Sequence, residues 1–112
     1  MWGQNEIKAL GKGRVGKRGA QYVLYFDKYT TELLRPFIGK KVIVYIMMNN
    51  NVPYSEGISV EGRLSYERSF RPPRVAVFLP KALNPTLMTL YDRELIVMIT
   101  VRGEDYGKEK AW

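Results

Sequence analysis

The stretch RVAVFLPKALNPTLMTLYDRELIVMITV, residues 74–101, occurs in the chain a second time in related form. Shifted back by 53 positions, it lies on QYVLYFDKYTTELLRPFIGKKVIVYIMM, residues 21–48. Each copy reads as a strand, a polar break, a short helix, a turn and a second strand. A unit of about 50 residues is too small to bury a core alone, so we expect the two copies to share one core. The aligned pairs of similar residues include Leu24 with Val77, Tyr25 with Phe78, Lys28 with Lys81, Lys40 with Arg93, Val42 with Leu95, Val44 with Val97 and Ile46 with Ile99.

The repeat extends toward the N-terminus of each copy, where a Gly-Arg pair precedes an apolar residue. Gly13-Arg14-Val15 aligns with Gly62-Arg63-Leu64 at an offset of 49, so the second copy carries four extra residues in its following loop. Insertions settle in exposed loops, and we therefore expect this loop, residues 65–74, to project from the body.

Length and composition predict a single domain. The chain has 112 residues, 46% of them apolar and 26% charged, which is ordinary for a globular protein. We place the repeats at about residues 6–48 and 58–101, with a connector at 49–57 and a polar tail at 102–112. No apolar run approaches the ~20 residues that span a bilayer, and the first residues lack the pattern of a signal peptide. These features predict a cytoplasmic protein that does not act in a membrane.

The residue types that the chain lacks exclude several kinds of chemistry. It contains no cysteine and no histidine, so disulfides, thiol nucleophiles, imidazole bases and the usual zinc sites are absent. Its carboxylates are scattered, and Asp92 and Glu94 are explained as turn and strand-edge residues. The glycines of residues 11–19 lack the Gly-Lys-Ser/Thr ending of a phosphate-binding loop. We predict a protein that is not an enzyme and that uses no cofactor or metal.

The net charge points to a polyanionic partner. There are 18 lysines and arginines against 11 acids, a net charge of +7. An excess of this size favours association with nucleic acid, the alternative being a solvated basic surface. The basic residues concentrate in two matching stretches. The first holds Lys8, Lys12, Arg14, Lys17 and Arg18, and the second holds Arg63, Arg68, Arg71 and Arg74 with Glu67 as its only acid.

The apolar pattern predicts the elements in each copy. Gly11 and Gly13 indicate a bend or a bulge in a weak first strand, Asp27 caps the first helix and Gly39 ends it. Asn84-Pro85 interrupts the second helix and restarts it. The continuous apolar run at 42–48 predicts a strand covered on both faces. The expected ranges are a first strand at 6–15, a basic turn at 16–19, strands at 22–26, 41–48, 58–64, 75–79 and 94–101, a helix at 31–37 and another from 80.

This order of elements resembles the AbrB/SpoVT family of swapped-hairpin β-domains. The residues that carry the resemblance are Gly13-Arg14-Val15, residues 22–28, Leu33-Leu34, Gly39-Lys40 and residues 42–44, and in the second copy Gly62-Arg63-Leu64, residues 75–83, Asp92-Arg93 and residues 95–97. The first copy has Asp27 where the family has proline. The resemblance implies a mainly β fold with short helices, an internally duplicated swapped-hairpin-like β-barrel with a pseudo-twofold axis.

The resemblance also implies a function and its residues. Family members bind double-stranded DNA as dimers, so a tandem chain is expected to bind it as a transcriptional regulator or chromatin-type protein. If a pseudo-twofold axis relates the copies, both basic loops emerge on one side and meet two stretches of phosphate backbone. The residues nominated are Arg14, Lys17, Arg18, Lys28, Arg63, Arg68, Arg71, Arg74 and Lys81, and the basic stretch itself adds Lys12.

Two alternatives remain open from the sequence. Tyr66 and Phe70 alternate with arginines in a pattern that stacks on bases of a single strand or an RNA loop, although Phe70 is better explained as an anchor that folds the loop back. The apolar strands at 42–48 and 95–101 favour an accessory subunit that meets RNA or an acidic protein in a larger assembly. The same strands are compatible with a homodimer.

Overall fold

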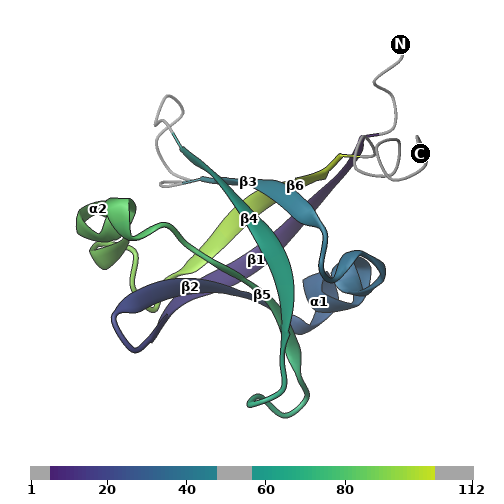
Figure 1. Cartoon of the computed structure of the whole chain (residues 1–112), viewed down its shortest axis with the longest axis horizontal. Coiled ribbons are helices and arrows are strands. Elements are labelled where there is room, and N and C mark those ends of the chain that lie inside the picture. The colour runs from purple at the N-terminus through teal and green to yellow at the C-terminus, as the bar shows by residue number, and fades with distance from the viewer. Residues whose placement is uncertain (1–5, 48–56, 103–112) are drawn as a thin grey trace, which may run out of the picture.

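The computed structural model describes residues 6–47 and 57–102, which form a closed barrel of six antiparallel strands flanked by two short helices (Figure 1). The prediction of a mainly β barrel with short helices is confirmed. The strands are β1 (Ile7–Arg18), β2 (Gln21–Phe26), β3 (Lys41–Ile46), β4 (Ile58–Glu67), β5 (Arg74–Phe78) and β6 (Glu94–Val101). The helices are α1 (Lys28–Leu34) and α2 (Asn84–Met88), with 3₁₀ turns η1 (Arg35–Phe37) and η2 (Lys81–Leu83). The predicted connector and tail lie outside the described residues except at positions 57 and 102.

The two halves interleave around the barrel. The strand order is β1-β2-β5-β4-β3-β6, closed by pairing of β6 with β1. Thus β3 pairs with β4 and β6, both from the second half, and the β1–β2 hairpin lies between β6 and β5. Neither half forms a sheet of its own, so the core is common to both.

Strand order and register are unchanged when β1 is exchanged with β4, β2 with β5 and β3 with β6. Val15 pairs with Leu24, and at the offsets of 49 and 53 this becomes the observed pair of Leu64 with Val77. The pair of Gly13 with Leu95 likewise becomes the pair of Gly62 with Val42. The pairing of the strands is therefore the same when the two halves are exchanged.

Side chains alternate between buried and exposed along the strands, and the buried ones fill the barrel interior. On β3, Val42, Val44 and Ile46 are buried, whereas Ile43 is half-buried and Tyr45 is 38% exposed. The prediction that this run is covered on both faces was wrong. A closed barrel turns only one face of each strand to the core, and α1 and α2 do not cover the outer face of β3.

Both first strands are longer than the sequence indicated. β1 runs as one continuous strand of twelve residues to Arg18, which pairs with Gln21 across a two-residue turn. In the second half β4 continues to Glu67, which pairs with Arg74, so the projecting loop is residues 68–73. The predicted basic loops are therefore the ends and tips of two long hairpins.

Hydrogen bonds between side chains and backbone amides fix where α1 begins and how it packs on the barrel. Asp27 caps α1 by accepting a hydrogen bond from the Thr30 amide at 2.8 Å, so the helix starts at Lys28, three residues before the predicted position. Thr31 fixes the helix to β5, because its hydroxyl accepts a hydrogen bond from the Val75 amide at 3.1 Å. The predicted break at Asn84-Pro85 is confirmed by the change from η2 to α2.

Candidate nucleic-acid interface

The two hairpins that carry the basic stretches contact each other. Arg18 at the end of β1 forms an ion pair with Glu67 at the end of β4, and the two positions are equivalent under the exchange of halves. The hydrogen bond to Glu67 raises the pKa of the Arg18 guanidinium above its ordinary value. Both hairpin tips lie in the lower part of the view in Figure 1. The two hairpins therefore contact each other between their tips, and we call their joined outer face the hairpin surface.

Aromatic contacts hold the longer loop against this surface. Phe70 packs edge-to-face on Tyr25 of β2, with 4.7 Å between ring centroids, and the Arg74 guanidinium lies 5.0 Å from the Phe70 ring centroid. This contact confirms the prediction that Phe70 anchors its loop. Tyr66 is half-buried, with the guanidinium groups of Arg35 and Arg68 at 5.8 and 5.6 Å from its ring centroid.

The glycine of each Gly-Arg pair is required by close packing. A Cβ atom on Gly13 would lie 2.9 Å from Leu24 Cδ1 and 3.0 Å from the Tyr25 carbonyl oxygen. A Cβ atom on Gly62 would lie 2.7 Å from Val77 Cγ1, in the corresponding place. Any larger residue at either position would force the neighbouring strand away.

The arginine of each Gly-Arg pair holds a turn of the other half. Arg14 Nη1 donates to the Asp92 carbonyl at 2.6 Å, and Arg63 Nη1 donates to the Gly39 carbonyl at 2.8 Å. Gly39 and Asp92 are equivalent positions that share a positive φ, +91° and +61°. Sequence reasoning assigned Arg14 and Arg63 to nucleic acid alone and missed this structural role, although the matched turn residues in the two copies were a signal for it.

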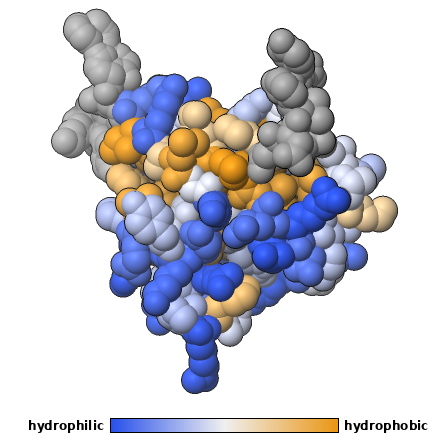
Figure 2. Space-filling view, turned by 180° about the vertical axis from the view of Figure 1, so that it is seen from behind, coloured by the Kyte–Doolittle hydropathy of each residue, from blue (hydrophilic) through white to orange (hydrophobic). Residues whose placement is uncertain are grey.

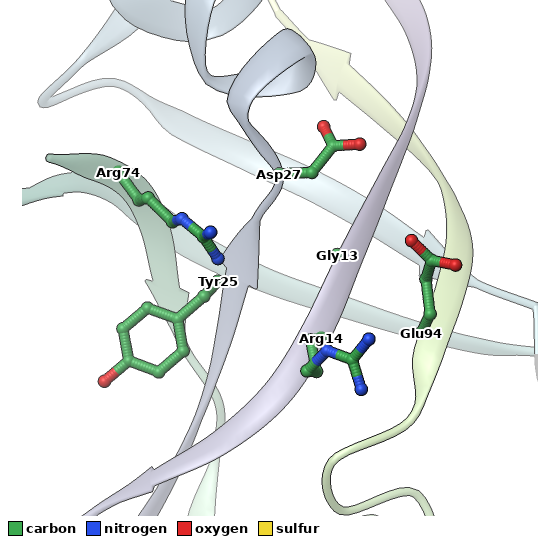
Figure 3. Close-up of a pocket in the computed structure, with 6 residues that line it drawn as sticks. All are labelled: Gly13, Arg14, Tyr25, Asp27, Arg74 and Glu94. Atoms are coloured by element: carbon green, nitrogen blue, oxygen red, sulfur yellow. The ribbon is translucent and has the colours of Figure 1, made fainter. Parts of the chain in front are cut away.

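A polar pocket of about 140 Å³ lies beside Arg14 (Figure 3). Figure 3 shows four charged side chains around Gly13: Asp27 and Glu94 on two sides, Arg14 and Arg74 on the others. Arg74 comes from the second hairpin, so the pocket continues the hairpin surface. Asp27 and Glu94 were not among the predicted site residues, because their approach to Arg14 depends on the pairing of β1 with β2 and β6.

The other predicted residues are distributed over a wider area. Lys17 is exposed near the first hairpin tip, its ammonium 5.3 Å from the Tyr22 ring centroid, and Arg68 and Arg71 are exposed in the second loop. Lys28 and Lys81 are exposed at the starts of α1 and η2. Lys12 stands six residues before Arg18 on β1, roughly 20 Å away along the strand, and is not part of the hairpin surface.

A hydrophobic band lies apart from the hairpin tips. In Figure 2 it crosses the upper part of the face, above a hydrophilic lower part. Leu10 of β1, Met98 of β6 and Tyr45 of β3 are paired in one row across three strands, and Leu10 is 60% exposed. Beside this row Leu10, Tyr29 and Ile96 line a groove of about 370 Å³.

Comparison with known proteins gives no relative for the chain: no family model, curated protein or solved structure matches it. In the described ranges, 6–47 and 57–102, no cluster of three or more carboxylates is suited to hold a metal ion. None of the helices in those ranges has the length and apolar character needed to cross a membrane.

Proposed function

We propose that the protein binds double-stranded DNA inside the cell, without catalysis, as a transcriptional regulator or a chromatin-type protein. The observation that carries the proposal is the contact between the hairpins at Arg18 and Glu67. It joins two segments, residues 14–22 and 63–74, that together hold seven basic side chains and one carboxylate. A continuous cationic surface of this kind suits two neighbouring stretches of phosphate backbone.

Within this surface the residues divide by role. Arg14, Arg18 and Arg63 have protein partners that fix the hairpins and turns. The exposed cations of the tips, Lys17, Arg68 and Arg71, together with the half-buried Arg74, are the proposed phosphate contacts. Lys28 and Lys81 extend the surface at the starts of the helices.

We further propose that the barrel is a fused pair of swapped-hairpin units of the AbrB/SpoVT kind. The unchanged strand order and register under exchange support this, as do the matched contacts of Arg14 with Asp92 and Arg63 with Gly39. In such a chain the two DNA-contacting loops of a dimer are supplied by one polypeptide.

The proposal is tested by titrating the purified chain against a duplex of about 20 base pairs, one of its strands and a structured RNA, at 50 and 200 mM salt. The four contacts of the tips alone predict a log–log salt slope of at least about 3.6, a loss of roughly 150-fold or more in duplex affinity over this range. Tightest binding to the duplex supports the proposal. Preference for RNA or the single strand supports the RNA-binding alternative, and absence of binding to all three refutes the nucleic-acid proposal.

A second candidate function, protein binding, is favoured by the hydrophobic band around Leu10 and Tyr45. The partner we propose is a second copy of the chain. Lys12 and Asp27 both line the groove, so two copies related by a twofold axis can pair the cation of one with the anion of the other. Light scattering tests this: a dimer supports it, a monomer refutes it, and aggregation favours an accessory subunit that lacks its acidic protein or RNA partner.

A further inference from the structure

The surroundings of Arg14 and of Arg63 carry different charges at equivalent positions. We call these two places the Arg14 end and the Arg63 end of the proposed interface. At one end Arg14 pairs directly across the strands with Glu94, and at the other Arg63 pairs directly with Lys41. Positions 94 and 41 correspond at the offset of 53. The same place in the two halves therefore holds a carboxylate in one and an ammonium group in the other.

Two further positions of the Arg14 pocket also differ between the halves. Asp27 corresponds to Pro80, and Arg74 corresponds to Gln21. The Arg14 pocket thus combines two guanidinium groups with two carboxylates, and a third carboxylate, that of Asp92, lies 3.6 Å from Arg14 Nη1. The Arg63 end has only cations among its equivalent charged residues. The halves match in backbone and register but present different chemistry.

Phosphate binding by Arg74 does not account for the carboxylates at the Arg14 end. Phosphate oxygens only accept hydrogen bonds, so carboxylates placed beside the arginines oppose their approach. A base-pair edge offers donors and acceptors together. In the major groove guanine presents two acceptors, O6 and N7, and the paired cytosine presents the N4 donor next to them.

Arg14 and Glu94 match that edge. They are directly paired residues of β1 and β6, so their Cα atoms lie roughly 5 Å apart. The hydrogen bond from Arg14 Nη1 to the Asp92 carbonyl fixes the guanidinium and leaves Nε and Nη2 to donate to guanine. Glu94 is exposed, so its carboxylate can accept a hydrogen bond from cytosine N4.

We infer that the Arg14 end reads a G·C base pair, with Arg14 on guanine and Glu94 on cytosine, and that the Arg63 end binds phosphate through Arg63 and Lys41. The preferred DNA site is therefore asymmetric, with one specified G·C pair displaced from its centre, despite the pseudo-twofold barrel. This inference rests on the proposed binding of duplex DNA and adds its sequence preference.

The test begins with selection of binding sites by the full chain from a pool of random duplexes. The selected duplex is then titrated beside a version in which the specified G·C pair is replaced by A·T. We expect the replacement to weaken binding roughly five- to hundredfold. Glu94→Gln is expected to reduce that ratio, because the amide presents a donor to the cytosine amino group as well as an acceptor. Glu94 is exposed, so the variant is expected to fold.

Lys41→Gln is the matched variant at the equivalent position of the other half. It is expected to keep the G·C preference and to lower the salt slope by about 0.9. Duplex binding with a palindromic site, or with no base preference, overturns the inference and leaves the proposed function standing. An unchanged G·C preference in Glu94→Gln overturns it as well. Absence of duplex binding overturns both.

Discussion

Neutralising the exposed cations of both hairpin tips should flatten the salt dependence of duplex binding. The variant is Lys17→Gln with Arg71→Gln, one residue from each hairpin, and both side chains are exposed. Each lost phosphate contact lowers the log–log slope by roughly 0.9, so the double variant should lower the slope by about 1.8. Over a fourfold rise in salt, the double variant should therefore lose about 12-fold less affinity than the wild-type protein.

A control variant removes the same charge from the opposite end of β1. Lys8→Gln with Arg102→Gln also lowers the net charge by two, but Lys8 stands nine residues from Lys17, roughly 30 Å along the strand. Arg102 lies beyond the end of β6, next to the start of β1, where it forms an ion pair with Glu6 at 3.8 Å. This pair of substitutions should leave the slope within a few tenths of the wild-type value.

Fluorescence anisotropy with one labelled duplex at 50, 100 and 200 mM salt measures both slopes. Circular dichroism of each variant confirms the fold beforehand. If the two variants change the slope equally, net charge alone governs binding and the hairpins have no special role. An unchanged slope in the hairpin variant removes Lys17 and Arg71 from the interface.

Three further predictions concern stability and are measured by urea unfolding. Gly39→Ala should destabilise the protein by about 1–2 kcal/mol, because φ is +91° there and a Cβ atom is strained in that conformation; an unchanged midpoint would contradict the turn geometry. Thr31→Val should cost about 1–3 kcal/mol, since it leaves the buried Val75 amide without its acceptor, and a neutral result would mean that this amide finds another partner. Asp27→Ala should cost about 1 kcal/mol through loss of the α1 cap, and an equal loss in Asp27→Asn, which keeps an acceptor, would argue against capping.

The sequence predicted the repeat in more detail than the elements within it. The offsets of 49 and 53 came from aligning Gly13-Arg14-Val15 on Gly62-Arg63-Leu64 and residues 21–48 on 74–101. The observed register obeys both offsets. This success has a physical basis, because equivalent strands in a shared barrel must bury equivalent side chains.

The glycines of β1 were misinterpreted for an identifiable reason. Gly11 and Gly13 were taken to indicate a bend or a bulge and Gly16 a turn, but at positions 11 and 16 glycine provides space for side chains that pack on the strand. A Cβ atom on Gly11 would lie 2.5 Å from Thr30 Cγ2, and one on Gly16 would lie 2.8 Å from Tyr25 Cε2. These contacts come from α1 and β2, so the local sequence of β1 carries no sign of them.

The candidate site was predictable in its cations but not in its carboxylates. Charge density along the chain identified the two hairpins, whereas Asp27 and Glu94 reach the Arg14 pocket only through strand pairing. Lys12 shows the opposite error. It belongs to the basic stretch by sequence, but the length of β1 carries it to the groove beside Leu10.

The most direct test of the account is an NMR titration of the ¹⁵N-labelled chain with a duplex, following the backbone amides. The account predicts that amides of residues 17–20 and 68–71 shift together and saturate with one dissociation constant, because the two hairpins form one surface joined at Arg18 and Glu67. The chemical shift of the Tyr45 amide, in β3, should not change. Shifts confined to one hairpin, or centred on Tyr45 and Met98 of the hydrophobic band, would contradict binding through the hairpins.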